Sequence, residues 1–302
     1  MLPVPQLWLM GDGPSYNCAT MKTIRIIPRL DIKGPNLVKG IHLEGLRVLG
    51  KPENFARYYY EQGADELLYM DVVASLYGRN NLLDIVRKTS REIFIPLTVG
   101  GGLRSLDDMH DALRAGADKV AINTSAIQNP EIVREAANKF GSSTVVVSIE
   151  VIKKSDGSYE VFMENGRQET GKDAIQWASQ VTSLGAGEIL LTSIDREGTG
   201  KGYDVTLTKK ISSMVSIPVI ACGGAGKKEH VLDVVRDGFA DAVSMASILH
   251  YDFVRNSLAK EDFENEGNTE FLKSQKNFKQ FNTETINSVK RHLNESGIAC
   301  RL

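Results

Sequence analysis

Two acidic side chains stand at the ends of apolar runs that have the length of β-strands. Asp31 ends the run IRIIPRLD, and Glu150 ends the run TVVVSIE. Two carboxyl groups that face one cavity can serve as general base and general acid if their surroundings separate their pKa values. The plainer alternative is that each carboxylate caps a turn or pairs with a nearby cation such as Lys33, Lys39 or Lys153.

Two glycine-rich segments, GGG at 100–102 and GGAG at 223–226, each follow an apolar run. Glycine lets backbone amides approach an anion closely, and phosphate often binds at such loops and at helix N-termini. Small polar residues come one apolar run later in each case: Asn123 and Thr124 in the first, and Ser247 in the second. A single glycine pair usually marks only a turn, but the repetition predicts two phosphate-binding cradles.

The chain also contains an internal repeat on a larger scale. IPLTVGGG (95–102) returns as IPVIACGG (217–224), and ADELLYMD (64–71) returns as AGEILLTS (186–193). Both pairs are 122 residues apart (217 − 95 and 186 − 64). This spacing predicts a duplicated half-barrel, whose two similar anchoring sites would suit an elongated ligand with similar groups at its two ends.

Apolar runs of strand length alternate with segments of helical period along the chain. The runs cover residues 24–31, 66–71, 94–100, 119–123, 144–150, 188–193, 217–222 and 241–246. Such alternation implies parallel pairing, and eight units predict a closed (β/α)8 barrel in which the ends of the first and fifth strands face each other. An open, doubly wound sheet is the alternative, but no strand is followed by a GxGxxG or GK[ST] phosphate loop.

Composition limits the classes of function. The net charge of −2 offers no basic excess, so we expect neither nucleic acid nor an anionic membrane as a partner. Cys18, Cys222 and Cys300 are widely scattered, which fits a reducing cytoplasm and leaves no CxxC site for a metal or redox cofactor. The apolar start MLPVPQLWLM is short and lacks a basic region, so we expect neither a signal peptide nor a membrane span.

Several long motifs resemble the cyclase subunit of imidazole glycerol phosphate synthase, and they cover residues about 24–252 and again 282–301. They are PRLDIKG with LVKG (28–40), ADELLYMDVVAS (64–75), IPLTVGGGLRS (95–105), GADKVAINTSA (116–126), GAGEILLTSIDREGTGKGYD (185–204) and IPVIACGGAGKKEH (217–230). The phosphoribosyl isomerase of the histidine pathway shares the half-barrel symmetry. However, TSIDREGTGKGYD and GADKVAINTSA are more similar to the cyclase.

The resemblance implies an ammonia-dependent reaction without a metal or cofactor. Its substrate is a bisphosphate, the phosphoribulosyl-formimino aminoimidazole carboxamide ribotide, and its products are imidazole glycerol phosphate and aminoimidazole carboxamide ribotide. Ammonia would come from glutamine through a separate glutaminase subunit in a heterodimer. Asp31 matches the family's essential carboxylate, and Lys39 matches the lysine of a mobile loop that closes over substrate.

The resemblance also assigns two phosphate sites and an ammonia gate. One phosphate would be held by Gly102, Asn123 and Thr124, and the other by Gly198, Gly224, Ala246 and Ser247. The gate is a ring of charged residues at the N-terminal ends of strands, made of Arg25, Glu66, Lys119 and Glu188. A salt-bridge ring that merely closes the barrel bottom is the plainer interpretation, and both can hold at once.

Three side chains depart from the family pattern. Glu150 stands where the family usually has Asp, Arg29 replaces a cysteine beside Asp31, and Glu197 replaces an Asp near a phosphate. An added methylene at a catalytic acid matters, because catalysis is sensitive to displacements of about 1 Å. These departures keep two alternatives open: a paralogue that channels ammonia to another phosphorylated or nucleotide-linked sugar, as in amidine modification of a surface polysaccharide, and a non-catalytic scaffold for a glutaminase.

The predicted domain organisation is a single barrel over residues 21–302. Residues 1–20 are expected to be a disordered or extraneous tail, since Met21 could be the true start. Relative to the family, residues 252–279 form an insertion at the catalytic face. We expect this insertion to be either a solvated excursion or a lid over a phosphate pocket.

Overall fold

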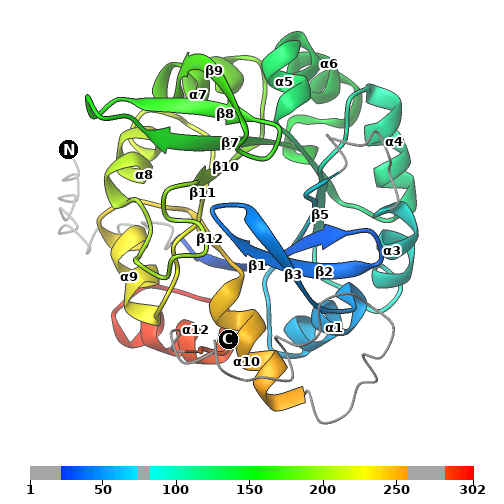
Figure 1. Ribbon diagram of the computed structural model, residues 1–302, viewed down its shortest axis with the longest axis vertical. Coiled ribbons are helices and arrows are strands. Elements are labelled where there is room, and N and C mark those ends of the chain that lie inside the picture. Colours follow the sequence, from blue (N-terminus) through cyan, green and yellow to red (C-terminus); the bar gives the residue numbers. More distant parts are fainter. Residues whose placement is uncertain (1–21, 74–81, 258–282) are drawn as a thin grey trace, which may run out of the picture.

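A computed structural model describes residues 22–73, 82–257 and 283–302. Parallel strands form its centre: β1 (Arg25–Lys33), β4 (Leu67–Asp71), β5 (Leu97–Gly100), β6 (Lys119–Ile122), β7 (Val145–Lys153), β10 (Glu188–Ser193), β11 (Val219–Cys222) and β12 (Ala242–Met245). Each pairs in parallel with the next, and β12 pairs with β1, so the ring closes (Figure 1). The predicted (β/α)8 barrel is confirmed, and the open sheet is excluded.

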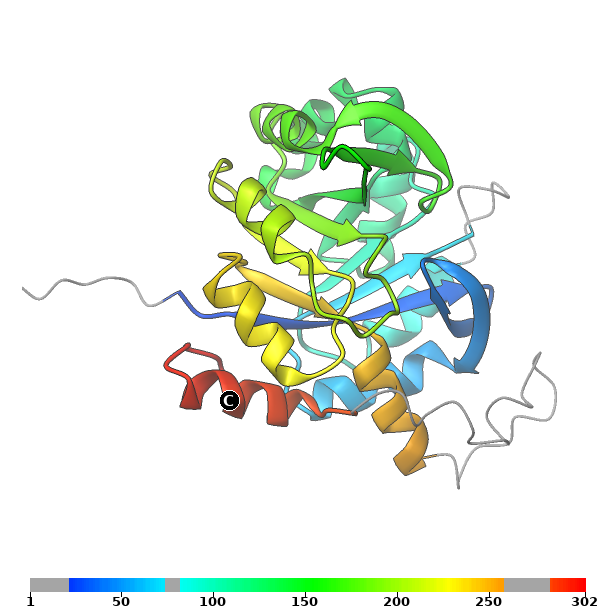
Figure 2. The same ribbon diagram turned by 60° about the vertical axis from the view of Figure 1, so that its left-hand side comes forward.

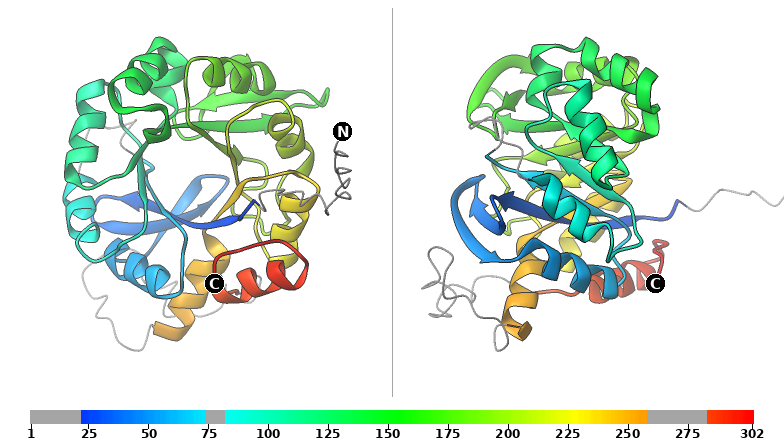
Figure 3. Two further views of the ribbon diagram at one scale, coloured as in Figure 1. Left: turned by 180° about the vertical axis from the view of Figure 1, so that it is seen from behind. Right: turned by 90° about the vertical axis from the view of Figure 1, so that its right-hand side faces the viewer.

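Helices surround the ring, as the views from both ends show (Figures 1 and 3). They are α1 (Pro52–Glu61), α3 (Leu82–Thr89), α4 (Leu106–Ala115), α5 (Thr124–Gln128), α6 (Glu131–Phe140), α7 (Ala174–Ser183), α8 (Val205–Ser212), α9 (Lys228–Arg236), α10 (Ser247–Ser257) and α12 (Ile286–Glu295), with a short 3₁₀ turn at Ser142–Thr144. Side chains set several of their starts: Ser105 and Asp108 form a capping box at α4, and Asp173 caps α7.

Two apolar layers hold the barrel together. Successive side chains of a strand face opposite sides, so β1 sends Ile26 and Leu30 to the helices and Ile27 into the barrel. The larger cluster lies between strands and helices, and the smaller one, which also contains Leu68 and Val146, fills the interior. This packing makes the barrel a solid support for the side chains at its ends.

Two hairpins that the sequence patterns did not predict extend the barrel at one end. The first strand of each half continues into one: β1 pairs antiparallel with β2 (Asn36–Ile41), which pairs with β3 (Glu44–Gly50), and β7 pairs with β8 (Tyr159–Met163), which pairs with β9 (Gln168–Asp173). Figures 2 and 3 show both hairpins at the same end of the molecule. The half-barrel duplication therefore extends to these two hairpins.

The hairpin tips are built alike and touch each other. His42 and Leu43 at one tip, and Glu164 and Asn165 at the other, all have positive φ angles between 51° and 64°. Left-handed conformations at two successive residues are typical of the tight type I′ turn. The Asn165 side-chain amide donates to the Leu43 carbonyl at 3.5 Å. The two halves thus meet above the barrel mouth.

Parts of the predicted domain organisation lie outside the described residues. These are the expected N-terminal tail and most of the 252–279 insertion, of which residues 252–257 continue α10. Within the described ranges, no helix is both long and apolar enough to cross a membrane.

Candidate active site

Asp31 and Glu150 stand at the mouth of the barrel, where the carboxyl ends of β1 and β7 leave the ring. Each is followed by its own hairpin, with Asp31 opposite Val38 in β2 and Glu150 opposite Phe162 in β8. The hairpins cover both carboxyl groups, which are only 2% and 3% exposed. Water screens such groups little, so their immediate neighbours decide their charge.

Asp31 has two cationic neighbours. The Arg29 Nε donates to Asp31 Oδ1 at 2.7 Å, and the Lys39 Nζ lies 3.4 Å from Oδ2. Lys39 also forms a short ion pair with Glu197. Burial by itself would raise the pKa of Asp31, but the charges of Arg29 and Lys39 outweigh burial and hold that pKa below its usual value. Asp31 is therefore an ionised carboxylate at neutral pH.

Glu150 has the opposite environment. Burial raises its pKa from 4.5 to about 7, and a hydrogen bond from the Gly166 amide and the charge of Arg29 offset burial only in part. Its Oε2 has no hydrogen-bond partner among the described residues. Near neutral pH a substantial fraction of Glu150 is protonated. The mouth thus presents one ionised carboxyl group and one that is partly protonated at neutral pH, an arrangement that suits acid–base catalysis.

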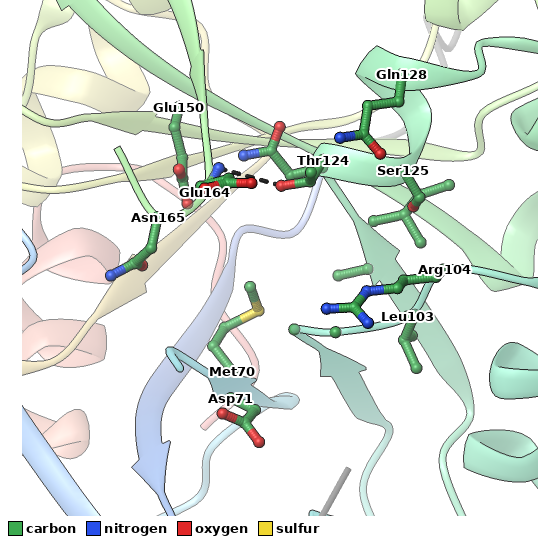
Figure 4. Close-up of a pocket in the computed structure, with 15 residues that line it drawn as sticks. Met70, Asp71, Leu103, Arg104, Thr124, Ser125, Gln128, Glu150, Glu164 and Asn165 are labelled. Carbon is green, nitrogen blue, oxygen red and sulfur yellow. Dashed lines mark hydrogen bonds between the residues drawn. The ribbon is translucent and has the colours of Figure 1, made fainter. Parts of the chain in front are cut away.

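The first cradle, defined by Gly102, Asn123 and Thr124, lines a cavity of about 250 Å³ (Figure 4). Glu150 lies on its wall, so this cavity opens directly onto the proposed acid. Thr124 Oγ1 accepts a hydrogen bond from the Glu164 amide at 3.1 Å, which ties the β8–β9 turn to the cradle. The structure therefore brings the three predicted residues together with one of the two carboxyl groups.

The second cradle, defined by Gly198, Gly224, Ala246 and Ser247, also forms one pocket, which Glu197 borders. Its volume is about 10 Å³, room for about one water molecule. Gly198 packs so closely beneath the β2–β3 hairpin that a Cβ there would lie 2.7 Å from the Gly40 oxygen. The His42 amide donates to the Glu197 carbonyl at 3.0 Å. This hairpin therefore packs against two of the residues that line the second cradle, Glu197 and Gly198.

Lys39 differs in setting from the loop lysine that the resemblance implied. It belongs to β2, is 3% exposed, and lies between Asp31 and Glu197. Of the three cations considered as simple partners for the carboxylates, Lys39 is the one that pairs with Asp31. The segment expected to be a mobile loop is a paired hairpin in this structure.

The four residues of the predicted gate meet at the opposite, N-terminal end of the barrel. Arg25 Nη1 lies 2.5 Å from Glu66 and 2.9 Å from Glu188, and Lys119 Nζ lies 3.1 Å from each of these carboxylates. Cations and anions alternate, so the ring is closed by four ion pairs and has no net charge. The plainer interpretation, a salt-bridge ring, describes its geometry fully.

Sequence patterns missed several residues that line the first cavity. Arg104, Glu164 and Asn165 surround it together with the predicted residues (Figure 4). Arg104 lies two residues after the glycine run, which is a signal that could have found it. Glu164 and Asn165 reach the cavity through the β8–β9 turn, and their position in the sequence does not indicate this. Within the described residues, no cluster of three or more His, Cys, Asp or Glu residues could hold a metal ion.

Comparison with known proteins gives a consistent result. Residues 25–255 match the family described as histidine biosynthesis protein. The chain is 61% identical to imidazole glycerol phosphate synthase subunit HisF of Legionella pneumophila over 209 residues, which make up 69% of this chain and 99% of that protein. It is 51% identical to the subunit of the same name of Methanocaldococcus jannaschii over 250 residues, 76% of this chain and 92% of that protein. It is 50% identical to the subunit of the same name of Alkaliphilus metalliredigens over 234 residues, 78% of this chain and 93% of that protein.

Proposed function

Because this chain belongs to the histidine biosynthesis protein family, we propose that it is the cyclase subunit of imidazole glycerol phosphate synthase. It uses ammonia to convert the phosphoribulosyl-formimino aminoimidazole carboxamide ribotide into imidazole glycerol phosphate and aminoimidazole carboxamide ribotide. The observation that carries the proposal is the pair of buried carboxyl groups of unlike pKa between two phosphate cradles. Neither alternative, the polysaccharide paralogue or the scaffold, is favoured by the names of the relatives.

The carboxyl groups fit the proton transfers that this reaction needs. Ammonia must lose protons as its nitrogen enters the imidazole ring, and the ionised Asp31 can accept a proton. The oxygen of the ribulosyl carbonyl must leave as water, and protonated Glu150 can donate to it. The phosphates at the ends of the substrate occupy the first and second cradles, which places the reacting centre between Asp31 and Glu150.

The decisive assay combines the purified chain with an ammonium salt and the bisphosphate substrate. We expect imidazole glycerol phosphate to form. Asp31→Asn should lower the rate about 10²–10⁴-fold, the usual contribution of an acid–base group. Circular dichroism establishes that both proteins are folded. A folded wild-type chain that forms no imidazole glycerol phosphate would refute the proposal. If Asp31→Asn instead left every phenotype unchanged, the scaffold alternative would stand.

We further propose that a glutaminase subunit supplies the ammonia at the N-terminal end of the barrel, through the charged ring. A neutral molecule can pass when one side chain of the ring swings aside. With the partner present, Arg25→Ala should lower the yield of product per glutamine hydrolysed, because an open ring lets ammonia exchange with solvent. An unchanged yield would argue that the ring only closes the barrel. A cytoplasmic location stays a prediction from the scattered cysteines.

A further inference from the structure

Arg29 is the largest fully buried charged side chain among the described residues, at 1% exposure. It lies two residues before Asp31 in β1 and on the same face of the strand. Its Nε donates to Asp31, and its Nη1 reaches Thr192 in β10 at 3.5 Å and Cys222 in β11 at 3.6 Å. The guanidinium thus spans the interior and is held by three strands of the ring.

The arrangement is poorly explained by stability alone. The Nη2 of Arg29 has no hydrogen-bond partner among the described residues, and a buried donor left without one costs free energy. Buried ion pairs are often no more stabilising than apolar side chains of similar volume. An incompletely satisfied, fully buried cation beside a proposed catalytic base indicates a role in the reaction.

The second cation near Asp31 is attached to a different part of the molecule. Lys39 lies on the β2–β3 hairpin, which packs against Glu197 and Gly198 at the border of the second cradle. The cavity there is about 10 Å³, so if the proposed function is right the cradle must widen to bind a phosphate, and the hairpin that packs on its border moves with it. Lys39, which is paired more closely with Glu197 than with Asp31, then moves away from Asp31.

We propose that Arg29 is the fixed counter-ion of Asp31, a positioning residue that holds the carboxylate in place while the β2–β3 hairpin and Lys39 move. This inference rests on the proposed function for the identity of the reaction and for the movement of the hairpin. The two cations divide their tasks: Arg29 belongs to the rigid ring, and Lys39 to the β2–β3 hairpin. A cysteine, which the family resemblance puts at this position, could not take the first task because a buried thiol is neutral.

The other ionisable groups around Asp31 do not replace Arg29. His250 from α10 is fully buried, and burial lowers its pKa to about 3, so it is neutral. Glu197 from the β10–α8 loop and Glu150 from β7 are carboxyl groups that would disfavour a charged Asp31. With Lys39 displaced, Arg29 is the one cation among the described groups that contacts Asp31.

The test compares Arg29→Met, Arg29→Lys and Lys39→Met. With saturating ammonia, the pH dependence of kcat/KM reports the ionisation of the free enzyme. Arg29→Met should move the acid limb to higher pH, because Asp31 without its counter-ion protonates more easily, and should lower kcat/KM about 10-fold or more at pH 6. Arg29→Lys, which keeps the charge, should restore the limb in part. Lys39→Met should raise KM and move the limb less than Arg29→Met does, because Lys39 lies farther from Asp31 than Arg29 does.

A second readout does not depend on turnover. In carboxyl ¹³C NMR, with the Asp31 signal assigned by its loss in Asp31→Asn, Asp31 should titrate below its usual pKa in Lys39→Met and clearly higher in Arg29→Met. Equal behaviour of these two variants, in the titration or in the acid limb, would overturn the inference. A wild-type chain that makes no imidazole glycerol phosphate would refute the proposed function, whereas the titration would still decide the role of Arg29.

Discussion

The two halves of the barrel share one arrangement, a strand with a carboxyl group followed by a hairpin, but the two carboxyl groups have opposite chemical roles. In each half the first strand carries a carboxyl group near its C-terminal end, and the hairpin that follows brings one polar group back to it. In the first half that group is the Lys39 ammonium, and in the second it is the uncharged Gly166 amide. The first carboxyl group also has Arg29 at 2.7 Å, while one oxygen of the second has no hydrogen-bond partner in the described part of the chain.

The comparison teaches that a duplicated scaffold need not duplicate charge. Both carboxyl groups are buried almost equally, so burial pushes both pKa values upward. The difference comes from the charges nearby: Arg29 in β1 and Lys39 on the first hairpin reverse the effect of burial at Asp31, and the backbone amide on the second hairpin does not do so at Glu150. One half thereby holds a base and the other an acid.

The largest expected effect comes from removing the acid. Glu150→Gln should lower kcat by about 10²–10⁴-fold, because the amide cannot donate a carboxyl proton. In the wild type, kcat should fall as the pH rises through about 7, since the protonated donor is lost. The measurement is kcat from pH 5 to 9 at constant free ammonia. Glu150→Asp, which keeps a carboxyl group, should retain an alkaline limb; a fully active Glu150→Gln would remove the acid from this account.

A second contrast concerns stability. Asp31→Asn should destabilise the fold at pH 7 by about 3–5 kcal/mol, because it leaves the buried Arg29 without its carboxylate. The pKa of Asp31 is depressed in the fold, so its contribution is present at neutral pH and is lost as the pH falls through that pKa. Urea denaturation at pH 7 measures the loss. No change in the free energy of unfolding would show that the pair is not a true counter-ion pair.

Glu150→Gln should change stability in the opposite direction to Asp31→Asn. The pKa of Glu150 is raised from 4.5 to about 7 in the fold, so the wild type loses stability as the pH rises between these values. Glutamine removes this loss, and the variant should gain about 3 kcal/mol relative to wild type between pH 4.5 and pH 8. Paired denaturation curves at the two pH values provide the measurement. A pH-independent difference would mean that the fold does not raise the pKa of Glu150.

The smallest expected effect is a difference in stability between variants of the two cradles. On the hairpin of the second half, the Glu164 amide donates a hydrogen bond to the Thr124 hydroxyl, whereas on the hairpin of the first half the His42 amide donates to a backbone carbonyl. Thr124→Val should therefore cost about 1 kcal/mol of stability, the usual value of a lost hydrogen bond. Ser247→Ala, the corresponding hydroxyl of the second cradle, should cost less. Thermal melts of both variants compare them, and equal losses would contradict this difference.

The sequence predicts the elements whose burial leaves a local hydrophobic pattern, and it does not predict the elements without such a pattern. The ring strands are buried on both sides, so they appear as continuous apolar runs, and counting them places Asp31 opposite Glu150. The hairpin strand β9, QETGKD, has no apolar pattern at all, and β3 begins with exposed residues. Since Lys39 and Gly166 reach the carboxyl groups through these hairpins, the charge of the site could not be predicted from periodicity.

The ring also has an order in which it can be assembled. The ring strands of the two halves pair at two places: β6 pairs with β7 between residues about 25 apart in the chain, whereas β12 pairs with β1 between residues as distant as Ala242 and Arg25. Pairing over such a distance is slow, because loop closure costs entropy before contacts form. The C-terminal segment stabilises the pairing of β12 with β1. Lys290 donates hydrogen bonds to the Gly63 carbonyl and to Asp65, and the Ile24 amide donates to the Ala299 carbonyl. We expect each half to gather first around its own hairpin, and the chain ends to lock the ring last.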